Sequence, residues 1–204
     1  MSEEIDNLRH RFEYVSKFVN FTNEDISILN LLGKTSETFV PMIVDKIFQR
    51  FLDFDVTKRY FLMRHFGYTG VVPVNESQLN LESEQMIFRR LSFAKYLKRI
   101  LRQKVWNDAF LEYLSFVGKI HTRFAGAHSV DIDYIHMNVS LGYTQHLLIE
   151  SVLANQQFDW TTKQSAILAL NKLFWIQNDF FAMHYIKLHP QPNNRCAPSP
   201  CFSM

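Results

Sequence analysis

An imidazole stands in an otherwise apolar row of a predicted helix. Around the stretch FVGKIHTRF, Phe110, Leu114, Val117, His121 and Phe124 follow one another at intervals of four, three, four and three residues. This spacing places the five side chains on one face of an α-helix, where His121 is the single polar residue. Because an unpaired buried polar group costs about 1–3 kcal/mol, both ring nitrogens of His121 need a partner.

Two sets of partners are compatible with this position. In the first, His121 hydrogen-bonds to a backbone carbonyl and to a tyrosine such as Tyr113, as an ordinary core histidine does. In the second, one nitrogen binds a metal and the other donates to a carbonyl that fixes the tautomer. No second histidine, cysteine or carboxylate lies three or four residues away on that face, so a bare zinc or iron site lacks ligands. One axial histidine is enough where haem supplies four in-plane nitrogens.

The elements that must position this histidine are predicted to be helices, and no segment indicates a strand. Thr22 and Asp25 have the spacing of a capping box, and Gly33 lies where a glycine stop is common. Residues 64–82 lack periodicity and are expected to form one long loop. We predict an all-α domain over residues 1–188 and a disordered, proline-rich tail over 189–204. The predicted helices cover about 23–32, 36–53, 55–61, 83–103, 106–122, 131–154 and 160–187.

Composition limits the classes of function. The chain has 204 residues, of which 47% are hydrophobic, and this suits one domain with a large core. The formal net charge of +2 gives no support for nucleic-acid binding by bulk charge. The start of the chain is charged where a signal peptide needs an apolar core, and no apolar run approaches the roughly 18 residues of a membrane span. We therefore expect a cytoplasmic protein, and both cysteines lie too near the end for a disulfide framework.

Three segments together resemble a known family. They are FLEYLSFVGKIHTRFAGAHSVDIDYIHMNVSLGYTQHLLIESVL (110–153), NKLFWIQNDFFAMHY (171–185) and IVDKIFQRFLDFDVTKRYF (43–61). In order and separation they are similar to the protoglobin and globin-coupled-sensor branch of the globins, and most like its stand-alone fungal members, over about residues 5–186. The family carries its proximal haem ligand in a hydrophobic-Gly-x-x-His element, which VGKIH places on His121.

The resemblance implies a protoglobin-type globin fold. Its features are an extra N-terminal helix at about 3–19, no D helix, and long G and H helices that mediate homodimerisation. The implied cofactor is haem b, with His121 as the metal ligand below it and the helix that holds Phe93 above it. Phe93 is equally compatible with an ordinary core position. The implied haem-contacting residues are Ile47, Phe48, Phe93, Val117 and His121.

The predicted distal side departs from the family. Many relatives have a tyrosine whose hydroxyl reaches the gas ligand, and the aligned residue here is Phe48. Losing this donor forfeits a hydrogen bond of about 0.5–1.5 kcal/mol, so weaker oxygen retention and relatively better carbon monoxide binding are expected. The helix at 83–103 contains no histidine, and its remaining polar candidates are Tyr96 and Gln85.

The other histidines are weaker candidates for the metal ligand. His136 is the best rival to His121, although it shares its helix with ordinary core positions, as does His146. His65 falls in the predicted loop. The remaining histidines are expected at surface or end positions: His10, His128, His184 and His189.

The segment at 88–104 has seven basic residues and no acidic one, with its cations and apolar residues in two stripes. The basic stripe could pair with haem propionates or with anionic lipid, or simply face solvent. The basic stripe is Lys95, Lys98, Arg99 and Arg102, and the apolar stripe is Ile87, Leu91, Ala94, Leu97 and Leu101.

The last four residues, CFSM, place Cys201 at the spacing read by farnesylating enzymes, without the aliphatic pair that such sites prefer. Stable anchoring needs a second signal, for which Cys196 is available, and the tail would then bring the basic helix to a membrane surface. An unmodified tail is the alternative.

Three functions follow from these patterns. The first is a haem globin that reversibly binds a diatomic gas (O2, CO or NO) for sensing, storage or scavenging. The second is a haem enzyme that converts peroxide or nitric oxide, but the helix at 83–103 offers no imidazole for acid/base work. The third is a haem-free helical adaptor.

Overall fold

The computed structural model describes residues 7–188, and all regular secondary structure in this range is helical. The predicted all-α fold is therefore confirmed, while residues 1–6 and the predicted tail lie outside the described residues. Between η1 and α6 there is no α-helix, which agrees with the predicted loop at 64–82 and with the missing D helix. The helices are α2 (Leu8–Phe18), α3 (Asn23–Lys34), α4 (Ser36–Leu52), α5 (Asp55–Lys58), α6 (Glu84–Arg102), α7 (Asp108–Ile120), α8 (Tyr134–Ala154) and α9 (Trp160–Leu188), with 3-10 turns η1 (Arg59–Leu62), η2 (Glu76–Gln78) and η3 (Arg123–His128).

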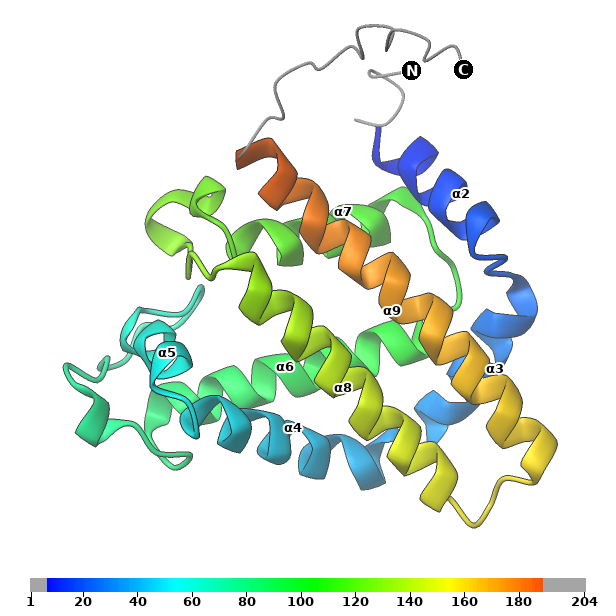
Figure 1. Cartoon of the computed structure of the whole chain (residues 1–204), viewed down its shortest axis with the longest axis horizontal. Helices are drawn as coiled ribbons and strands as arrows, with labels where there is room; N and C mark the ends of the chain where they lie inside the picture. The colour runs from blue at the N-terminus through cyan, green and yellow to red at the C-terminus, as the bar shows by residue number, and fades with distance from the viewer. Residues whose placement is uncertain (1–6, 189–204) are drawn as a thin grey trace, which may run out of the picture.

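The two longest helices form one layer over the rest of the molecule. In Figure 1, α8 and α9 run antiparallel across the front, with α6 and α7 behind them. α8 has 21 residues and α9 has 29, as expected for long G and H helices. Helix α9 also packs on α3 and α7, and α4 packs on α6 and α8, so the buried apolar residues of all these helices form one core.

Local signals at the helix ends are confirmed. The Thr22 backbone N–H donates to Asp25 at 2.7 Å, and the reciprocal bond of a capping box is also present. Asp159 accepts from the backbone of Thr162 at 2.7 Å, at the start of α9.

The helix predicted at about 106–122 ends earlier than expected. Helix α7 stops at Ile120, and Phe124, the last member of the apolar row, lies in η3 and is 44% exposed.

Gly33 does not end a helix, contrary to the sequence prediction. It lies inside α3, where a Cβ would come within 2.8 Å of Arg102 Cγ and 2.9 Å of the Leu101 carbonyl oxygen. The glycine is therefore needed for the close approach of α3 and α6. Arg102 completes this contact, because its Nε donates to the Gly33 carbonyl at 2.9 Å.

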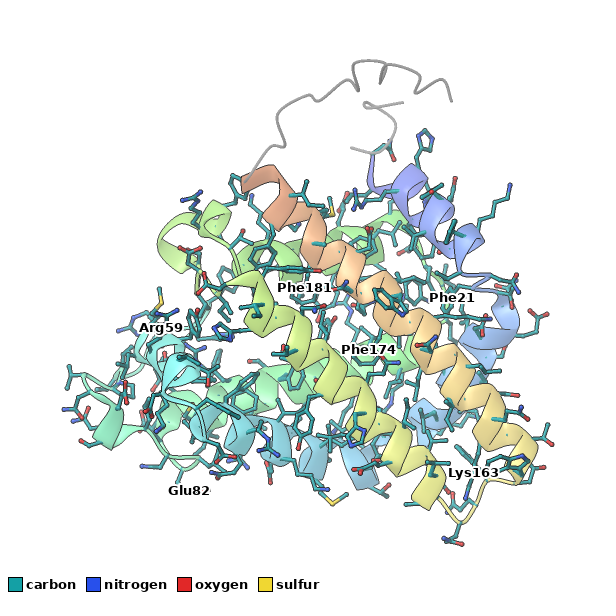
Figure 2. The ribbon with its side chains drawn as sticks, viewed as in Figure 1. Phe21, Arg59, Glu82, Lys163, Phe174 and Phe181 are labelled. Carbon is teal, nitrogen blue, oxygen red and sulfur yellow. The ribbon has the colours of Figure 1, made fainter. Side chains whose placement is uncertain are left out.

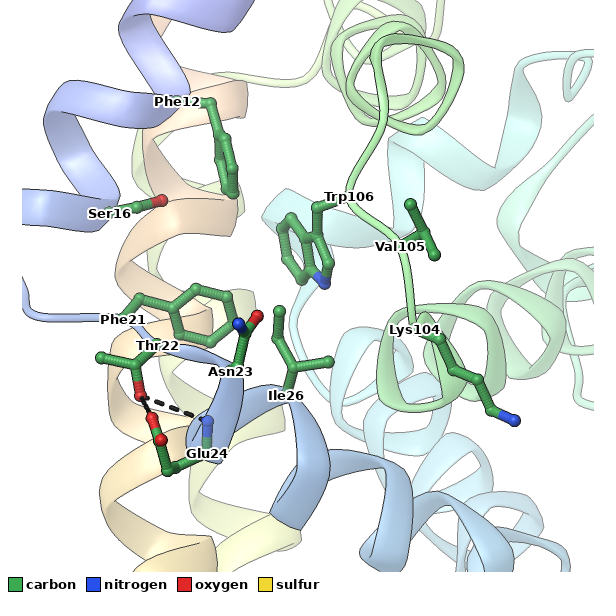
Figure 3. Close-up of a pocket in the computed structure, with 10 residues that line it drawn as sticks. All are labelled: Phe12, Ser16, Phe21, Thr22, Asn23, Glu24, Ile26, Lys104, Val105 and Trp106. Atoms are coloured by element: carbon green, nitrogen blue, oxygen red, sulfur yellow. Dashed lines mark hydrogen bonds between the residues drawn. The ribbon is translucent and has the colours of Figure 1, made fainter.

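The N-terminal helix α2 is joined to the body of the molecule by ion pairs and stacked rings. The Arg11 guanidinium makes two hydrogen bonds of 2.6 Å to Asp179 on α9. Phe12 stacks on Trp106 with ring centroids 5.2 Å apart, and Phe21 meets the indole from another side (Figure 3). These contacts make α2 part of the domain, as the resemblance implied.

Substituting Gly33→Ala should lower the free energy of unfolding by about 1–3 kcal/mol, because the new methyl group collides with backbone atoms of α6. Urea denaturation measures this loss. The control is Gly142→Ala on α8, where a Cβ meets nothing within 4 Å, so alanine should stabilise the helix by about 0.5–1 kcal/mol. Equal effects of the two substitutions would contradict a special packing role for Gly33.

Candidate functional site

A cavity of about 310 Å³ lies between α4, α6, α7 and α8. This volume is at the lower end of the range for ligand-binding pockets. All five residues predicted to contact a cofactor line it, together with many other aromatic rings. The five are Ile47, Phe48, Phe93, Val117 and His121.

The imidazole of His121 is held at the end of α7. Because the helix stops there, no backbone N–H of a following turn bonds to the Val117 carbonyl. His121 Nδ1 donates to this carbonyl instead, at 2.7 Å. The His121 carbonyl in turn accepts from the Ile132 N–H at 2.9 Å and from the Tyr185 hydroxyl at 3.2 Å. Phe181 of α9, labelled in Figure 2, places its ring edge against the imidazole, with centroids 5.4 Å apart.

These contacts leave one ring nitrogen of His121 available. With the proton on Nδ1, Nε2 is a bare acceptor, and it has no hydrogen-bond partner among residues 7–188. Burial, with a smaller contribution from the charge of Arg89, lowers the pKa of His121 to about 4 against the opposing effect of the bond to the Val117 carbonyl. The imidazole is therefore neutral at pH 7, which is the state that binds metals. Of the first alternative, the bond to a backbone carbonyl is formed and the bond to Tyr113 is not. The Tyr113 ring lies under the Arg99 guanidinium, whose Cζ is 3.6 Å from the ring centroid.

The glycine of the Gly-x-x-His element sets the position of α7. A Cβ on Gly118 would lie 2.4 Å from the Phe180 carbonyl oxygen and 3.0 Å from His184 Cδ2. Only glycine therefore allows the last turn of α7 to lie directly on the backbone of α9. Since His121 follows one turn later, this contact positions the imidazole over the cavity.

Phenylalanine rings from α4, η1 and α6 line another part of the cavity. Phe48 contacts the rings of Phe51, Phe61 and Phe93, with centroid separations of 5.9, 5.9 and 6.2 Å. No hydroxyl replaces the tyrosine that many relatives have at the position of Phe48. This part of the cavity is apolar around Phe48 and lacks a hydrogen-bond donor at that position.

The two polar side chains proposed for the distal helix are already engaged. Tyr96 lines the cavity, but its hydroxyl donates to Gln177 in the core. Gln85 is buried, donates to the Phe61 carbonyl at 2.9 Å and accepts from the His65 backbone at 3.0 Å. Both side chains therefore hold the fold together, and neither is free to bind a ligand.

Two further histidines line the same cavity. His65 Nδ1 bonds to the Phe66 carbonyl at 2.7 Å, and burial lowers its pKa to about 4. His136 lies with its ring against Tyr60, at a centroid distance of 5.7 Å. Within residues 7–188, no group of three or more histidine, cysteine, aspartate or glutamate side chains could hold a metal ion. A metal in this part of the chain would thus depend on a cofactor for most of its ligands.

One histidine was misplaced by the sequence prediction. His184 was expected at a surface or end position, but it is buried on α9, with its Nε2 3.1 Å from the Ser115 hydroxyl.

Two cations of the basic segment at 88–104 have specific partners that the sequence did not indicate. Lys98 and Arg102 pair with Glu37 on α4, and none of the four residues of the basic stripe lines the cavity.

The apolar stripe of α6 is only partly buried. Leu97 and Leu101 are in the core, whereas Ile87 and Leu91 are exposed, Leu91 at 57%. The stripe that faces the cavity instead includes Arg89, Phe93 and Tyr96. Sequence reasoning missed Arg89, which is one turn before Phe93 and was counted among the seven basic residues of 88–104 without being assigned to a stripe. The spacing of four residues from Phe93 was the signal that could have identified it.

None of the helices between residues 7 and 188 is both long enough and apolar enough to cross a membrane.

Comparison with known proteins supports the globin architecture. The family model described as Protoglobin matches residues 8–189. The fold is similar to that of the globin domain of the Geobacter sulfurreducens globin-coupled sensor, with a TM-score of 0.65 and 15% sequence identity. This match covers 85% of the present chain and 96% of the sensor domain. No curated protein sequence matches the chain.

The haem-free chain should lose stability as the pH falls from about 6.5 to about 4. The folded pKa of both His65 and His121 is lowered to about 4, so in this window only the unfolded chain binds the two protons. Urea denaturation at pH 7, 6 and 5 measures the effect. His121→Leu should flatten the dependence, whereas His10→Gln, at an exposed position on α2, should leave it unchanged. Identical pH profiles for wild type and His121→Leu would contradict burial of a neutral imidazole.

Proposed function

Because the chain belongs to the protoglobin family, we propose that it binds haem b through His121 and reversibly binds a diatomic gas there. The observation that carries this proposal is the protonation state and tautomer of the His121 imidazole. His121 is neutral, Val117 fixes its tautomer, and its free Nε2 belongs to a cavity lined largely by aromatic residues. Haem, when bound, supplies four in-plane nitrogens and a metal with a further position for O2, CO or NO.

The residues of the cavity fit a haem-binding role in different ways. The Val117 carbonyl orients the imidazole and makes it a better electron donor, as second-sphere acceptors do at metal sites. Phe48 and Phe93 keep water from the opposite side and would border the gas. Ile47 and Val117 would complete the apolar contact with the porphyrin.

Gas binding fits the cavity better than peroxide turnover. Efficient peroxide cleavage needs an acid/base group near the reacting oxygen atoms. On the wall that holds Phe48 and Phe93, the hydroxyl of Tyr96 is committed to Gln177. The Tyr96 hydroxyl is therefore not available for proton transfer, and α6, which holds Phe93, carries no imidazole for that role.

We also propose that the chain forms a homodimer through α8 and α9. The outer faces of these two helices expose large apolar side chains, which a partner copy would cover. Prenylation of Cys201, a second lipid on Cys196 and the resulting membrane contact stay predictions, because both cysteines lie outside the described residues. The exposed apolar residues are Ile135, Val139, Leu168 and Trp175.

Wild-type protein supplied with haem should show a Soret band, and His121→Ala should abolish it or reduce it to the level of free haem. The reason is that no other imidazole of the described cavity lining is held at the end of α7 as His121 is. His136→Ala is the matched control, since it removes another cavity imidazole and should leave the band intact. Wild-type protein that stays colourless after haem supplementation would refute the proposed function.

Phe48→Tyr should slow the dissociation of oxygen by about two- to tenfold, which corresponds to one regained hydrogen bond of about 0.5–1.5 kcal/mol. Carbon monoxide is the matched ligand, because it carries little negative charge and should dissociate at nearly the wild-type rate. Flash photolysis and stopped-flow mixing measure both rates. A parallel change for the two gases would indicate altered packing around Phe48 instead of a new hydrogen bond.

A further inference from the structure

Arg89 is the one charged side chain among the described residues that line the cavity. It belongs to α6, lies one turn before Phe93 and is only 6% exposed. The other lining residues carry apolar groups, hydroxyls or imidazoles, and no carboxylate is among them. The cavity therefore holds a buried positive charge without a described negative one.

The hydrogen bonds of Arg89 use only part of its guanidinium. Nη2 donates to the carbonyls of Tyr60 and Met63, at 3.1 and 2.6 Å, and the group lies 5.0 Å from the centroid of the Phe61 ring. Nε is buried and has no hydrogen-bond partner. Within residues 7–188, no aspartate or glutamate forms an ion pair with it. The two backbone bonds fix the cation in place and leave donors unused.

Leaving this cation unpaired is costly. A buried charge needs a counter-charge or several hydrogen bonds to offset the loss of hydration. Burial lowers the pKa of Arg89 only to about 10, so the side chain remains protonated at pH 7. Its charge also acts on His121, whose pKa it lowers, so the two groups are electrostatic neighbours in the cavity.

We propose that Arg89 is an anion-binding residue, whose free N–H groups pair with a negatively charged group of the molecule held in the cavity. The identity of that molecule as haem rests on the proposed function, whereas the demand for a negative charge does not. The anionic group can come from two sources: a propionate carboxylate of haem, or a small anion bound to ferric haem. Charge-assisted hydrogen bonds of this kind are the stronger ones in proteins, and the fixed guanidinium suits them.

The first test uses the haem-free chain and two fluorescent probes of similar shape, anionic 1-anilinonaphthalene-8-sulfonate and neutral N-phenyl-1-naphthylamine. Wild type should bind the anionic probe, and Arg89→Gln should weaken that binding by about tenfold or more, as expected for one lost charge-assisted bond. Binding of the neutral probe should not change. Lys95→Gln is the matched control, because it removes the same charge from an exposed position on α6.

The second test separates the two sources. If the partner is a propionate, wild type should bind haem more tightly than haem dimethyl ester, and Arg89→Gln should lose that preference. If the partner is a metal-bound anion, haem binding should be equal in both proteins. Fluoride binding to the ferric form, measured by absorption, should then be about tenfold weaker in Arg89→Gln. Either result supports the proposal.

Equal behaviour of Arg89→Gln and Lys95→Gln with all of these ligands would overturn it. If Arg89→Gln fails to fold, Arg89→Lys keeps the charge and should retain the preference for the anionic probe; loss of that preference in a folded Arg89→Lys chain also counts against the proposal. A wild-type chain that binds no porphyrin refutes the proposed function, but the comparison of the two fluorescent probes still tests Arg89.

Discussion

The cavity depends on one hydrogen bond at the end of α7. An α-helix leaves its last carbonyls without partners, and here the Val117 carbonyl receives the Nδ1 proton of the imidazole one turn later. The bond has two effects at once, because it satisfies the Val117 carbonyl and leaves the other ring nitrogen of a cavity-lining imidazole without a proton. If α7 continued for another turn, the backbone would take the Val117 carbonyl, and His121 would lose its fixed tautomer. The early stop at Ile120 is thus a requirement of the site.

The position of that helix end is fixed by contacts with α9 that involve both backbone and side chains. Gly118 lets the two helices touch, and Phe181 supports the ring of His121. Tyr185 holds the carbonyls of His121 and Ile132 together, with bonds of 3.2 and 2.7 Å, across the loop that joins α7 to α8. The part of the cavity around Phe48 is built differently, from phenylalanine rings that touch mainly one another. The cavity therefore combines a hydrogen-bonded imidazole on α7 with a cluster of phenylalanine rings from α4, η1 and α6.

The features that could be predicted from the sequence are those determined by residues close together in the chain. The capping box at Thr22 and the helix predicted at about 36–53, which is α4, depend on neighbours within a few residues, and both were predicted correctly. The place of His121 on its apolar face was also accessible, because a period of 3.6 residues requires no knowledge of other helices. Gly33 was misinterpreted because its role lies in a contact with α6, far along the chain.

The burial of His184 and the cavity position of Arg89 were missed for the same reason. A basic segment with one inward-facing arginine has the composition of a surface helix, and only the tertiary packing of α6 distinguishes Arg89 from Arg90 beside it. The protoglobin resemblance supplied the order of the helices and the role proposed for His121. It could not indicate how the polar groups of the cavity are paired, since pairing depends on individual side chains from different helices.

The hydroxyl of Tyr185 sets a limit on how far this domain can be shortened for engineering. Because it holds the carbonyl of His121 from the last turns of α9, a truncation between Phe181 and Tyr185 would spare the described side chains that line the cavity and still release the backbone of His121. The minimal fragment for crystallisation, fusion or transplantation thus extends through Tyr185, about one helical turn beyond Phe181, the last described residue that lines the cavity.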